Sequence, residues 1–220
     1  MDIGFLFDWD GVVIDSHAQH EESWALLSAE LGRPLPEGFF KKTFGMRNQS
    51  IMPLWMPELE GNQERIIALG DRKEELYRDI LRRDGIEALP GVKDFLKAAR
   101  AAGIPASVGS STPRKNIDTV IEMAGLEGLF DAIVSADDVT RGKPDPEVFL
   151  KGAQRLDRPP SRCVVFEDAF VGIEAGKAGG MKVVGIATTH PIEKLTLADI
   201  AVHDLVNVDP VELAKRLGLG

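Results

Sequence analysis

Cysteine is nearly absent from this chain, and its scarcity limits how the chain can be stabilised. Cys163 is the single cysteine among 220 residues, so no disulfide can form within the chain, and a reducing, cytoplasmic compartment is expected. We expect Cys163 to be a buried small side chain rather than a nucleophile, because it opens an apolar run. A chain of this length buries about 70% of its unfolded surface, so it can fold without cross-links.

Long apolar runs and an excess of basic residues are also missing. No apolar stretch approaches the roughly 18 residues of a membrane-spanning helix. The N-terminal segment carries Asp2, Asp8 and Asp10 in place of a basic flank, so a signal peptide is not expected. The formal net charge of −9 argues against a nucleic-acid partner but permits a small anionic substrate held by a few local cations. We expect a monomer, because nothing in the sequence demands an oligomer, and a small anionic molecule as its partner.

Short apolar segments alternate with amphipathic ones, and this alternation predicts an α/β fold. Strand and helix in turn, joined by short links, are typical of a doubly wound parallel sheet with a Rossmann-like core. Five runs rich in Val, Ile, Phe and Ala lack polar alternation, as strands covered on both faces do: 4–7, 106–109, 132–135, 163–166 and 182–186. Apolar residues at helical spacing predict helices over 91–102, 114–124, 146–155 and 172–178.

Residues 16–88 interrupt this alternation. They contain no convincing strand, but helices are predicted over 18–31 and 63–83. The second of these helices is expected to expose its charged residues, Lys73 and Glu74 among them. The sequence therefore predicts an α/β catalytic core and an inserted all-helical cap. The core would comprise 1–15 and 89–220, and the cap 16–88.

Polar and charged side chains follow four of the predicted strands. Because the carboxyl ends of parallel strands meet at one edge of a sheet, we expect these side chains to lie together. Carboxylates beside an apolar strand need a cation, and oxygen ligands in this number favour Mg²⁺. Gly11 would let the backbone turn tightly beside the ion. The set comprises Asp8, Asp10, Ser110, Ser111, Thr112, Lys143, Glu167 and Asp168.

The same segments resemble the four motifs of the haloacid dehalogenase superfamily, in family order. FDWDGVVIDS resembles the first motif, DxDGxxxDS, and VGSST resembles the second. GKPDPEVF resembles the third motif, and VVFEDAFVGIEAGKAGG resembles the fourth. The insert resembles the small cap of the branch that contains phosphatases and β-phosphoglucomutase. The resemblance implies a Mg²⁺-dependent phosphatase that forms an aspartyl phosphate.

The resemblance also implies a role for each matching residue. Asp8 would be the nucleophile, and Asp10 the general acid and then the general base. The Ser110 hydroxyl, the backbone N–H near Ser111 and the Lys143 ammonium would bind the phosphoryl oxygens. The implied Mg²⁺ ligands are the Asp8 carboxylate, the Asp10 backbone carbonyl, Asp168, and Glu167 either directly or through water.

Three residues of the insert are candidates for contact with the substrate. His20 lies about ten residues after Asp10, as a histidine does in the mutase members of the resembled branch. Lys73 corresponds to a lysine on a later cap helix of those members. Arg47 follows Gly45 at a shorter spacing than the branch shows. All three could instead belong to solvated helix faces.

Two other functions remain open at this point. A β-phosphoglucomutase-like enzyme would pass the phosphoryl group from Asp8 to a sugar hydroxyl instead of to water. A non-catalytic phospho-binding regulator would share the α/β core and Mg²⁺, but it needs neither a helical cap nor Asp10. Within the resembled superfamily, an aspartate at position 10 favours phosphoryl transfer from an oxygen ester. The expected activity is therefore hydrolysis of a small organic phosphate monoester.

Overall fold

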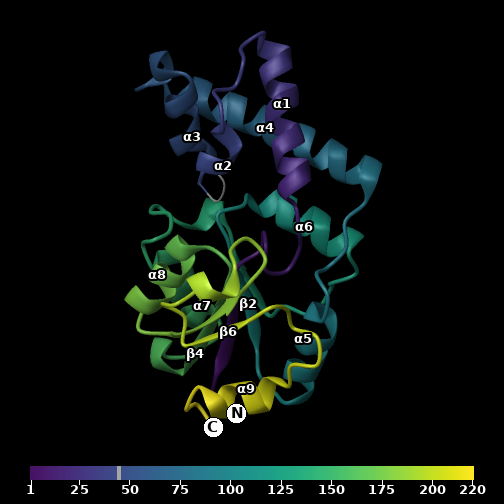
Figure 1. Cartoon of the computed structure of the whole chain (residues 1–220), viewed down its shortest axis with the longest axis vertical. Helices are drawn as coiled ribbons and strands as arrows, with labels where there is room; N and C mark the ends of the chain where they lie inside the picture. Colours follow the sequence, from purple (N-terminus) through teal and green to yellow (C-terminus); the bar gives the residue numbers. More distant parts are fainter. Residues whose placement is uncertain (44–45) are drawn as a thin grey trace. The chain divides into compact units, whose positions relative to one another are not determined.

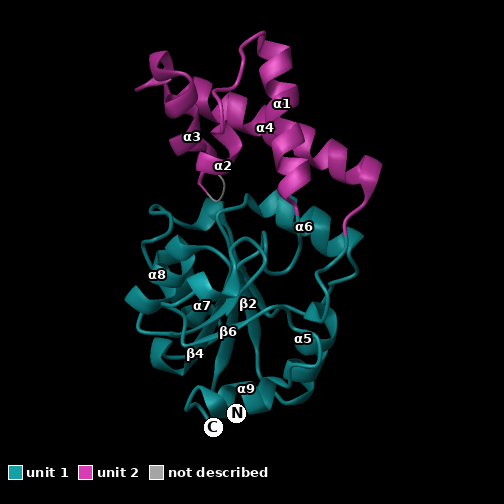
Figure 2. Cartoon of the chain, in the orientation of Figure 1, with its two compact units in different colours: residues 1–15, 87–220 teal, residues 16–86 magenta. Residues whose placement is uncertain are grey.

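The computed structural model describes residues 1–43 and 46–220 (Figure 1). These residues form two compact units, shown in different colours in Figure 2. The first unit contains Met1–Asp15 and Glu87–Gly220, and the second contains Ser16–Ile86. In the described part of the chain, no helix combines the length and the apolar character needed to cross a membrane.

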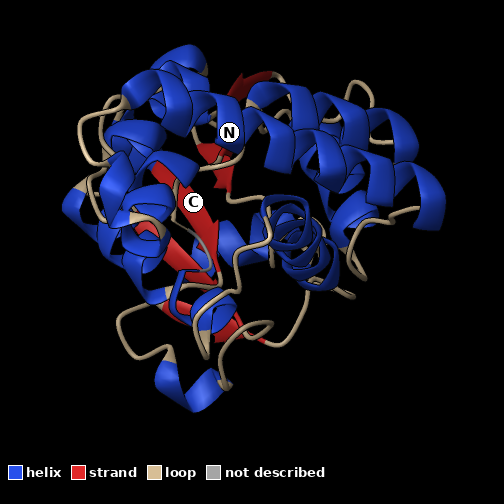
Figure 3. Cartoon of the chain, turned by 90° about the horizontal axis from the view of Figure 1, so that it is seen from above, coloured by secondary structure: helices blue, strands red, loops and turns tan. Residues whose placement is uncertain are grey.

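A parallel sheet forms the centre of the first unit, so the predicted doubly wound α/β fold is confirmed. Among the described residues the sheet has six strands in the order β3-β2-β1-β4-β5-β6 (red in Figure 3). The order reverses between β1 and β4, which is where such sheets bind ligands. The strands are β1 Gly4–Phe7, β2 Ala106–Gly109, β3 Ala132–Val134, β4 Cys163–Glu167, β5 Lys182–Ile186 and β6 Ile200–Val202.

Helices cover both faces of the sheet. α7 packs on β1, β2 and β3, while α8 packs on β4 and β5 and contacts α7, so these two helices share one face. α5 packs on β2 and on α9. The helices are α5 Val92–Ala101, α6 Arg114–Met123, α7 Glu147–Arg155, α8 Phe170–Ala178 and α9 Pro210–Arg216. Short 3₁₀ helices are η2 Ala136–Asp138, η3 Pro160–Arg162 and η4 Ile192–Lys194.

Alternation along β1 sends its side chains into two apolar layers. Phe7 points to one face, where its ring stacks on Phe166 with centroids 4.4 Å apart and meets Phe95 of α5 edge-on. Leu6 points to the other face, into the buried cluster beneath α7 and α8. Burying a side chain of this size contributes about 1.5–3 kcal/mol. β1 is thus fixed from both faces, and so is the residue that follows it, Asp8.

Four α-helices make up the described part of the second unit. Their shared apolar core includes Trp24, Trp55 and Ile66. Asn62 caps the longest helix, and its side-chain oxygen accepts a hydrogen bond from the backbone N–H of Arg65. The elements are α1 His17–Leu31, α2 Phe39–Thr43, α3 Asn48–Trp55, η1 Pro57–Leu59 and α4 Gln63–Asp84.

The prediction that α4 exposes its charged residues is partly wrong. Lys73 and Glu74 are buried, with only 2% and 5% of their surface exposed. They are buried because α1 and α3 supply polar partners for them, and those partners are remote in the sequence. A run of charged residues on a helix is therefore not sufficient to identify a solvated face.

The chain passes between the two units twice, near residues 15 and 87. On the first unit, the two connecting segments are neighbours. Ile14 forms an antiparallel bridge with Ala88. The backbone N–H of Leu89 donates a hydrogen bond to the carbonyl of Val13 over 2.8 Å. The chain therefore leaves the first unit and returns to it at one place.

Candidate active site

Asp8 follows β1 directly and is held at the carboxyl end of the sheet. Its backbone N–H donates to the carbonyl of Phe166 in β4 over 2.9 Å, which continues the pairing of the two strands. Trp9 is fully buried. The backbone then turns at Gly11, where φ is +86°. A Cβ at this position would lie 2.0 Å from Oδ2 of Asp168, so the turn requires glycine.

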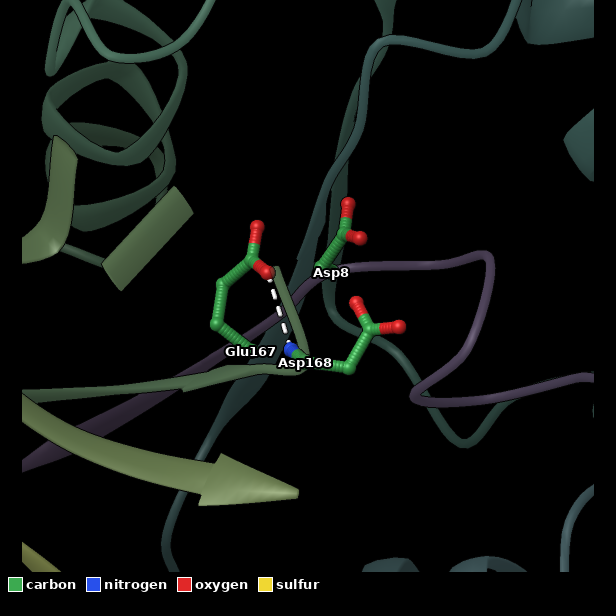
Figure 4. Close-up of side chains that lie close together, drawn as sticks. All are labelled: Asp8, Glu167 and Asp168. Carbon is green, nitrogen blue, oxygen red and sulfur yellow. Dashed lines mark hydrogen bonds between the residues drawn. The ribbon is translucent and has the colours of Figure 1, made fainter. Parts of the chain in front are cut away.

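Three carboxylates meet at this edge of the sheet (Figure 4). Asp8 follows β1, Glu167 ends β4, and Asp168 is the next residue. One oxygen from each carboxylate lies within 4.8 Å of the other two. Glu167 and Asp168 are almost completely buried, and Asp8 is 9% exposed. The sheet topology thus brings together acids that are about 160 residues apart in the sequence.

Lys143 places its ammonium among these acids. Nζ donates to Oδ1 of Asp8 and to Oε1 of Glu167, each over 2.6 Å. It also lies 4.8 Å from the ring centroid of Phe149. The loop that carries Lys143 is fastened by Glu147 at the start of α7, whose carboxylate accepts hydrogen bonds from backbone N–H groups of that loop.

Both oxygens of Glu167 are committed to neighbouring groups. Oε1 accepts the hydrogen bond from Lys143, and Oε2 accepts the backbone N–H groups of Asp168 and Ala169, each over 2.9 Å. Gly172 of α8 lets this carboxylate pack against the helix, because a Cβ there would lie 1.6 Å from Oε1. Glu167 therefore anchors both the lysine and the start of α8.

A hydroxyl group from the loop after β2 reaches the other predicted catalytic acid. Thr112 Oγ1 donates to Oδ2 of Asp10 over 2.6 Å, and the backbone N–H of Thr112 donates to Oγ of Ser110 over 3.0 Å. Ser110 is buried, and Ser111 is half-buried. The structure therefore links Asp10 to the segment that contains the predicted phosphate-binding serines.

Thr189 is a residue of this site that the sequence analysis missed. Its hydroxyl donates to Oδ2 of Asp168. Thr189 lies in the loop after β5, three residues beyond Ile186. Thr189 follows the end of β5 in the same way that the predicted site residues follow the ends of β1, β2, β3 and β4. The resembled motifs end before this loop, so they gave no signal.

Negative charge exceeds positive charge in this cluster. Burial raises the pKa of Asp8 to about 7; Lys143 opposes the shift and Glu167 adds to it. Burial also raises the pKa of Asp168 well above its usual range, and the neighbouring carboxylates add to that shift. Burial disfavours the ammonium of Lys143, but the carboxylates of Asp8 and Glu167 outweigh it and raise the pKa of the lysine. Three acids around one lysine are therefore under-compensated and fit a hard divalent cation.

In the second unit, His20 and Lys73 lie together. Lys73 Nζ is 2.7 Å from Nδ1 of His20 and 3.1 Å from Oε1 of Glu74. Because an ammonium has no lone pair, it donates and Nδ1 accepts. Glu74 also accepts a hydrogen bond from the side chain of Asn48 over 2.7 Å. The imidazole of His20 stacks on Tyr77 with ring centroids 4.0 Å apart.

Arg47 is the third cap candidate. It is the N-cap residue of α3 and is half-buried. Phe44 and Gly45, on which the predicted spacing of Arg47 depends, lie outside the described residues. The substrate roles of Arg47, His20 and Lys73 stay predictions.

Known proteins are similar to this sequence over most of its length. The profile of the haloacid dehalogenase-like hydrolase family matches residues 4–180. The chloroplastic 5-amino-6-(5-phospho-D-ribitylamino)uracil phosphatase of Arabidopsis thaliana is 34% identical over 217 residues, which span 97% of this chain and 57% of the plant protein. The fructose-1-phosphate phosphatase YqaB of Escherichia coli K12 is 33% identical over 187 residues, which span 83% of this chain and 95% of that protein.

A solved structure agrees with both sequence matches. A haloacid dehalogenase hydrolase from Entamoeba histolytica superimposes with a TM-score of 0.86 at 26% identity, covering 98% of this chain and 99% of that chain. Profile, relatives and structure therefore point to one family, whose motifs contain the acids and the lysine described above. The chain belongs to the haloacid dehalogenase-like hydrolase family.

Proposed function

We propose that this enzyme is a Mg²⁺-dependent phosphatase acting on a small organic phosphate monoester through an aspartyl phosphate. One observation carries the proposal: Lys143 contacts Asp8 and Glu167 beside Asp168 at the edge of the sheet. Asp8, Asp168 and the backbone carbonyl of Asp10 would hold the Mg²⁺, with Glu167 beside them. The ion would supply positive charge that stabilises the phosphoryl oxygens during transfer.

The two carboxylates of the first motif divide the chemistry. Asp8 attacks phosphorus, the bond to the leaving oxygen breaks, and the phosphoryl group is attached to Asp8. Asp10 gives its proton to the leaving oxygen and then takes a proton from the water that attacks the same phosphorus. Cleavage of the bond to Asp8 releases inorganic phosphate and regenerates both carboxyl groups. Thr112 orients Asp10 through its hydrogen bond to Oδ2.

Other residues bind the substrate in this proposal. The ammonium of Lys143, the hydroxyl of Ser110 and the backbone N–H of Ser111 bind the phosphoryl oxygens. His20, Arg47 and Lys73 contact the remainder of the substrate. Their alternative role is to stabilise the second unit, which the buried pair of Lys73 and Glu74 favours.

Turnover of p-nitrophenyl phosphate tests the proposal. Wild-type enzyme should release p-nitrophenol with Mg²⁺, and EDTA should stop the reaction reversibly. Asp8→Asn should lower kcat by at least about a thousandfold, because it removes the nucleophile. Asp94→Asn, at an exposed position of α5, is the matched control and should retain activity. If wild type and Asp8→Asn are equally inert over a panel of sugar phosphates, nucleotides and pyrophosphate, the proposal is wrong.

Product analysis separates the phosphatase from the alternatives. With β-glucose 1-phosphate and a trace of the bisphosphate, release of inorganic phosphate alone supports hydrolysis. Formation of glucose 6-phosphate would instead identify a β-phosphoglucomutase-like transfer. A phospho-binding regulator would bind phosphate compounds without turning any of them over.

A further inference from the structure

Asp168 receives a hydrogen bond that the proposed mechanism leaves without a role. The donor is Oγ1 of Thr189, in the loop between β5 and η4, and the acceptor is Oδ2 of Asp168. Asp168 is 1% exposed, so the bond is not in competition with bulk water. One oxygen of a buried carboxylate is therefore fixed by a hydroxyl from another segment.

The turn at Gly11 restricts the same oxygen sterically. A Cβ at Gly11 would lie 2.0 Å from Oδ2 and 2.6 Å from Cγ of Asp168, which shows how closely the carboxylate packs on the turn. Rotation of the carboxylate would either break its bond to Thr189 or press an oxygen against this backbone. The two contacts together fix the direction in which the second oxygen of Asp168 points.

A ring stack fastens the loop that carries Thr189. His190, the next residue, stacks on Phe170 of α8 with centroids 4.1 Å apart and planes 12° apart. Phe170 is 38% exposed, although large apolar side chains of this fold are mostly buried. Phe170 is also only two residues after Asp168. The loop therefore contacts the segment from Asp168 to Phe170 twice, through Thr189 and through His190.

We propose that Thr189 is a positioning residue that holds the Asp168 carboxylate in the orientation required to bind Mg²⁺, and that the stack of Phe170 and His190 keeps Thr189 in place. This inference rests on the proposed function, because it takes Asp168 as a ligand of the metal. Residues that orient a metal ligand typically change the affinity for the metal by about 10- to 100-fold. A carboxylate that is already oriented loses less freedom when the metal binds.

Calorimetric titration of the metal-free protein with MgCl₂ tests the proposal. Thr189→Val keeps the shape but removes the hydroxyl, and it should weaken Mg²⁺ binding about tenfold or more. Thr189→Ser keeps the hydroxyl and should restore most of the affinity. Thr188→Val, at the exposed neighbouring position, is the control and should bind as wild type does. Phe170→Ala should weaken binding by about threefold, because the stack acts only through the loop.

A kinetic measurement distinguishes positioning from general damage. Thr189→Val should raise the Mg²⁺ concentration for half-maximal activity, while KM for the phosphate ester at saturating Mg²⁺ stays unchanged. Wild-type Mg²⁺ affinity in folded Thr189→Val overturns the proposal. If that variant does not fold, Phe170→Ala decides, since a weaker affinity supports the proposal and an unchanged one overturns it. Failure of the proposed function is distinct, because wild type would then neither bind Mg²⁺ nor hydrolyse phosphate esters.

Discussion

Each unit buries a lysine beside carboxylate groups, and the balance of charge around the two lysines differs. Among the described residues, Lys143 donates to two carboxylates and a third lies beside them. Lys73 donates to the single carboxylate of Glu74 and to the ring nitrogen of His20. Aromatic rings of the second unit lie about 5.4 and 5.5 Å from Nζ of Lys73 and complete its surroundings.

The balance of charge separates a binding site from a structural cluster. Excess charge of one sign is costly to bury unless a ligand of opposite sign compensates it. The cluster around Lys143 holds more acids than cations, and burial, with Glu167 adding to it, raises the pKa of Asp8 although Lys143 opposes the shift. The pair of Lys73 and Glu74 is balanced by its own partners.

The largest effect is expected from removing the lysine of the under-compensated cluster. Lys143→Met should lower the free energy of unfolding of the metal-free protein by about 3–5 kcal/mol, because buried acids lose their cation. It should also reduce kcat at least about a hundredfold. Urea unfolding with and without MgCl₂ measures the first effect. Mg²⁺ should recover more stability in the variant than in wild type, and an equal gain in both would contradict the charge argument.

Removing Lys73 should lower the free energy of unfolding by less than removing Lys143 does. Added Mg²⁺ should not change this loss. Lys73→Met removes the ammonium beside Glu74 but keeps the hydrogen bond from the amide of Asn48, and it should lower the free energy of unfolding by about 2–3 kcal/mol. The double variant Lys73→Met/Glu74→Gln should be more stable than the sum of the single losses predicts, by about 1–2 kcal/mol. Strict additivity in this cycle would show that the two side chains do not act as a pair.

A smaller effect is expected from the hydroxyl that orients Asp10. Thr112→Val should lower kcat about tenfold with little change in KM, because Asp10 loses the hydrogen bond that positions it for proton transfer. Thr112→Ser should remain close to wild type. Thr119→Val is a suitable control, since its hydroxyl donates within α6, to the carbonyl of Lys115. A rise in KM alone would point to a role in substrate binding instead.

The smallest effect is expected at the partly exposed ion pair of Arg155 and Asp138. The loss of stability at this pair is the reference for the losses expected at the two buried clusters. The hydrogen bond from Arg155 lowers the pKa of Asp138 to about 2, although partial burial opposes the shift. A depressed pKa in the folded state means that Asp138 stabilises the fold above its unfolded pKa near 4, and this contribution is lost as the pH falls towards 2. Because solvent screens the pair, Asp138→Asn should cost about 1 kcal/mol.

Urea unfolding at pH 7 and near pH 3 measures this effect. The variant should approach wild-type stability at the lower pH, and added salt should narrow the gap at pH 7. A loss of equal size at both pH values would mean that the carboxylate charge of Asp138 is not the cause. The destabilisation by Lys73→Met should, in contrast, change little with salt, because its partners are buried.

Local sequence was sufficient to predict the central strands and their acids, but not the partners of buried polar groups. β1, β4 and β5 are apolar runs between turn residues, and parallel topology places the ends of such strands at one edge. β6 has three half-buried residues, which is too short for a periodic pattern. Lys73 is buried against His20, which lies 53 residues away in the sequence. No local sequence pattern predicts a contact between residues so far apart in the chain.

The second unit begins and ends at one junction, where the backbone N–H of Leu89 donates a hydrogen bond to the carbonyl of Val13 and Ile14 pairs with Ala88. A loop of a few residues could join Asp15 to Glu87 and close the sheet-bearing unit without it. A helical unit from a relative could be grafted at the same two points. Under the proposed function, exchange of this module would change substrate preference, while the proposed catalytic residues keep their places at the sheet.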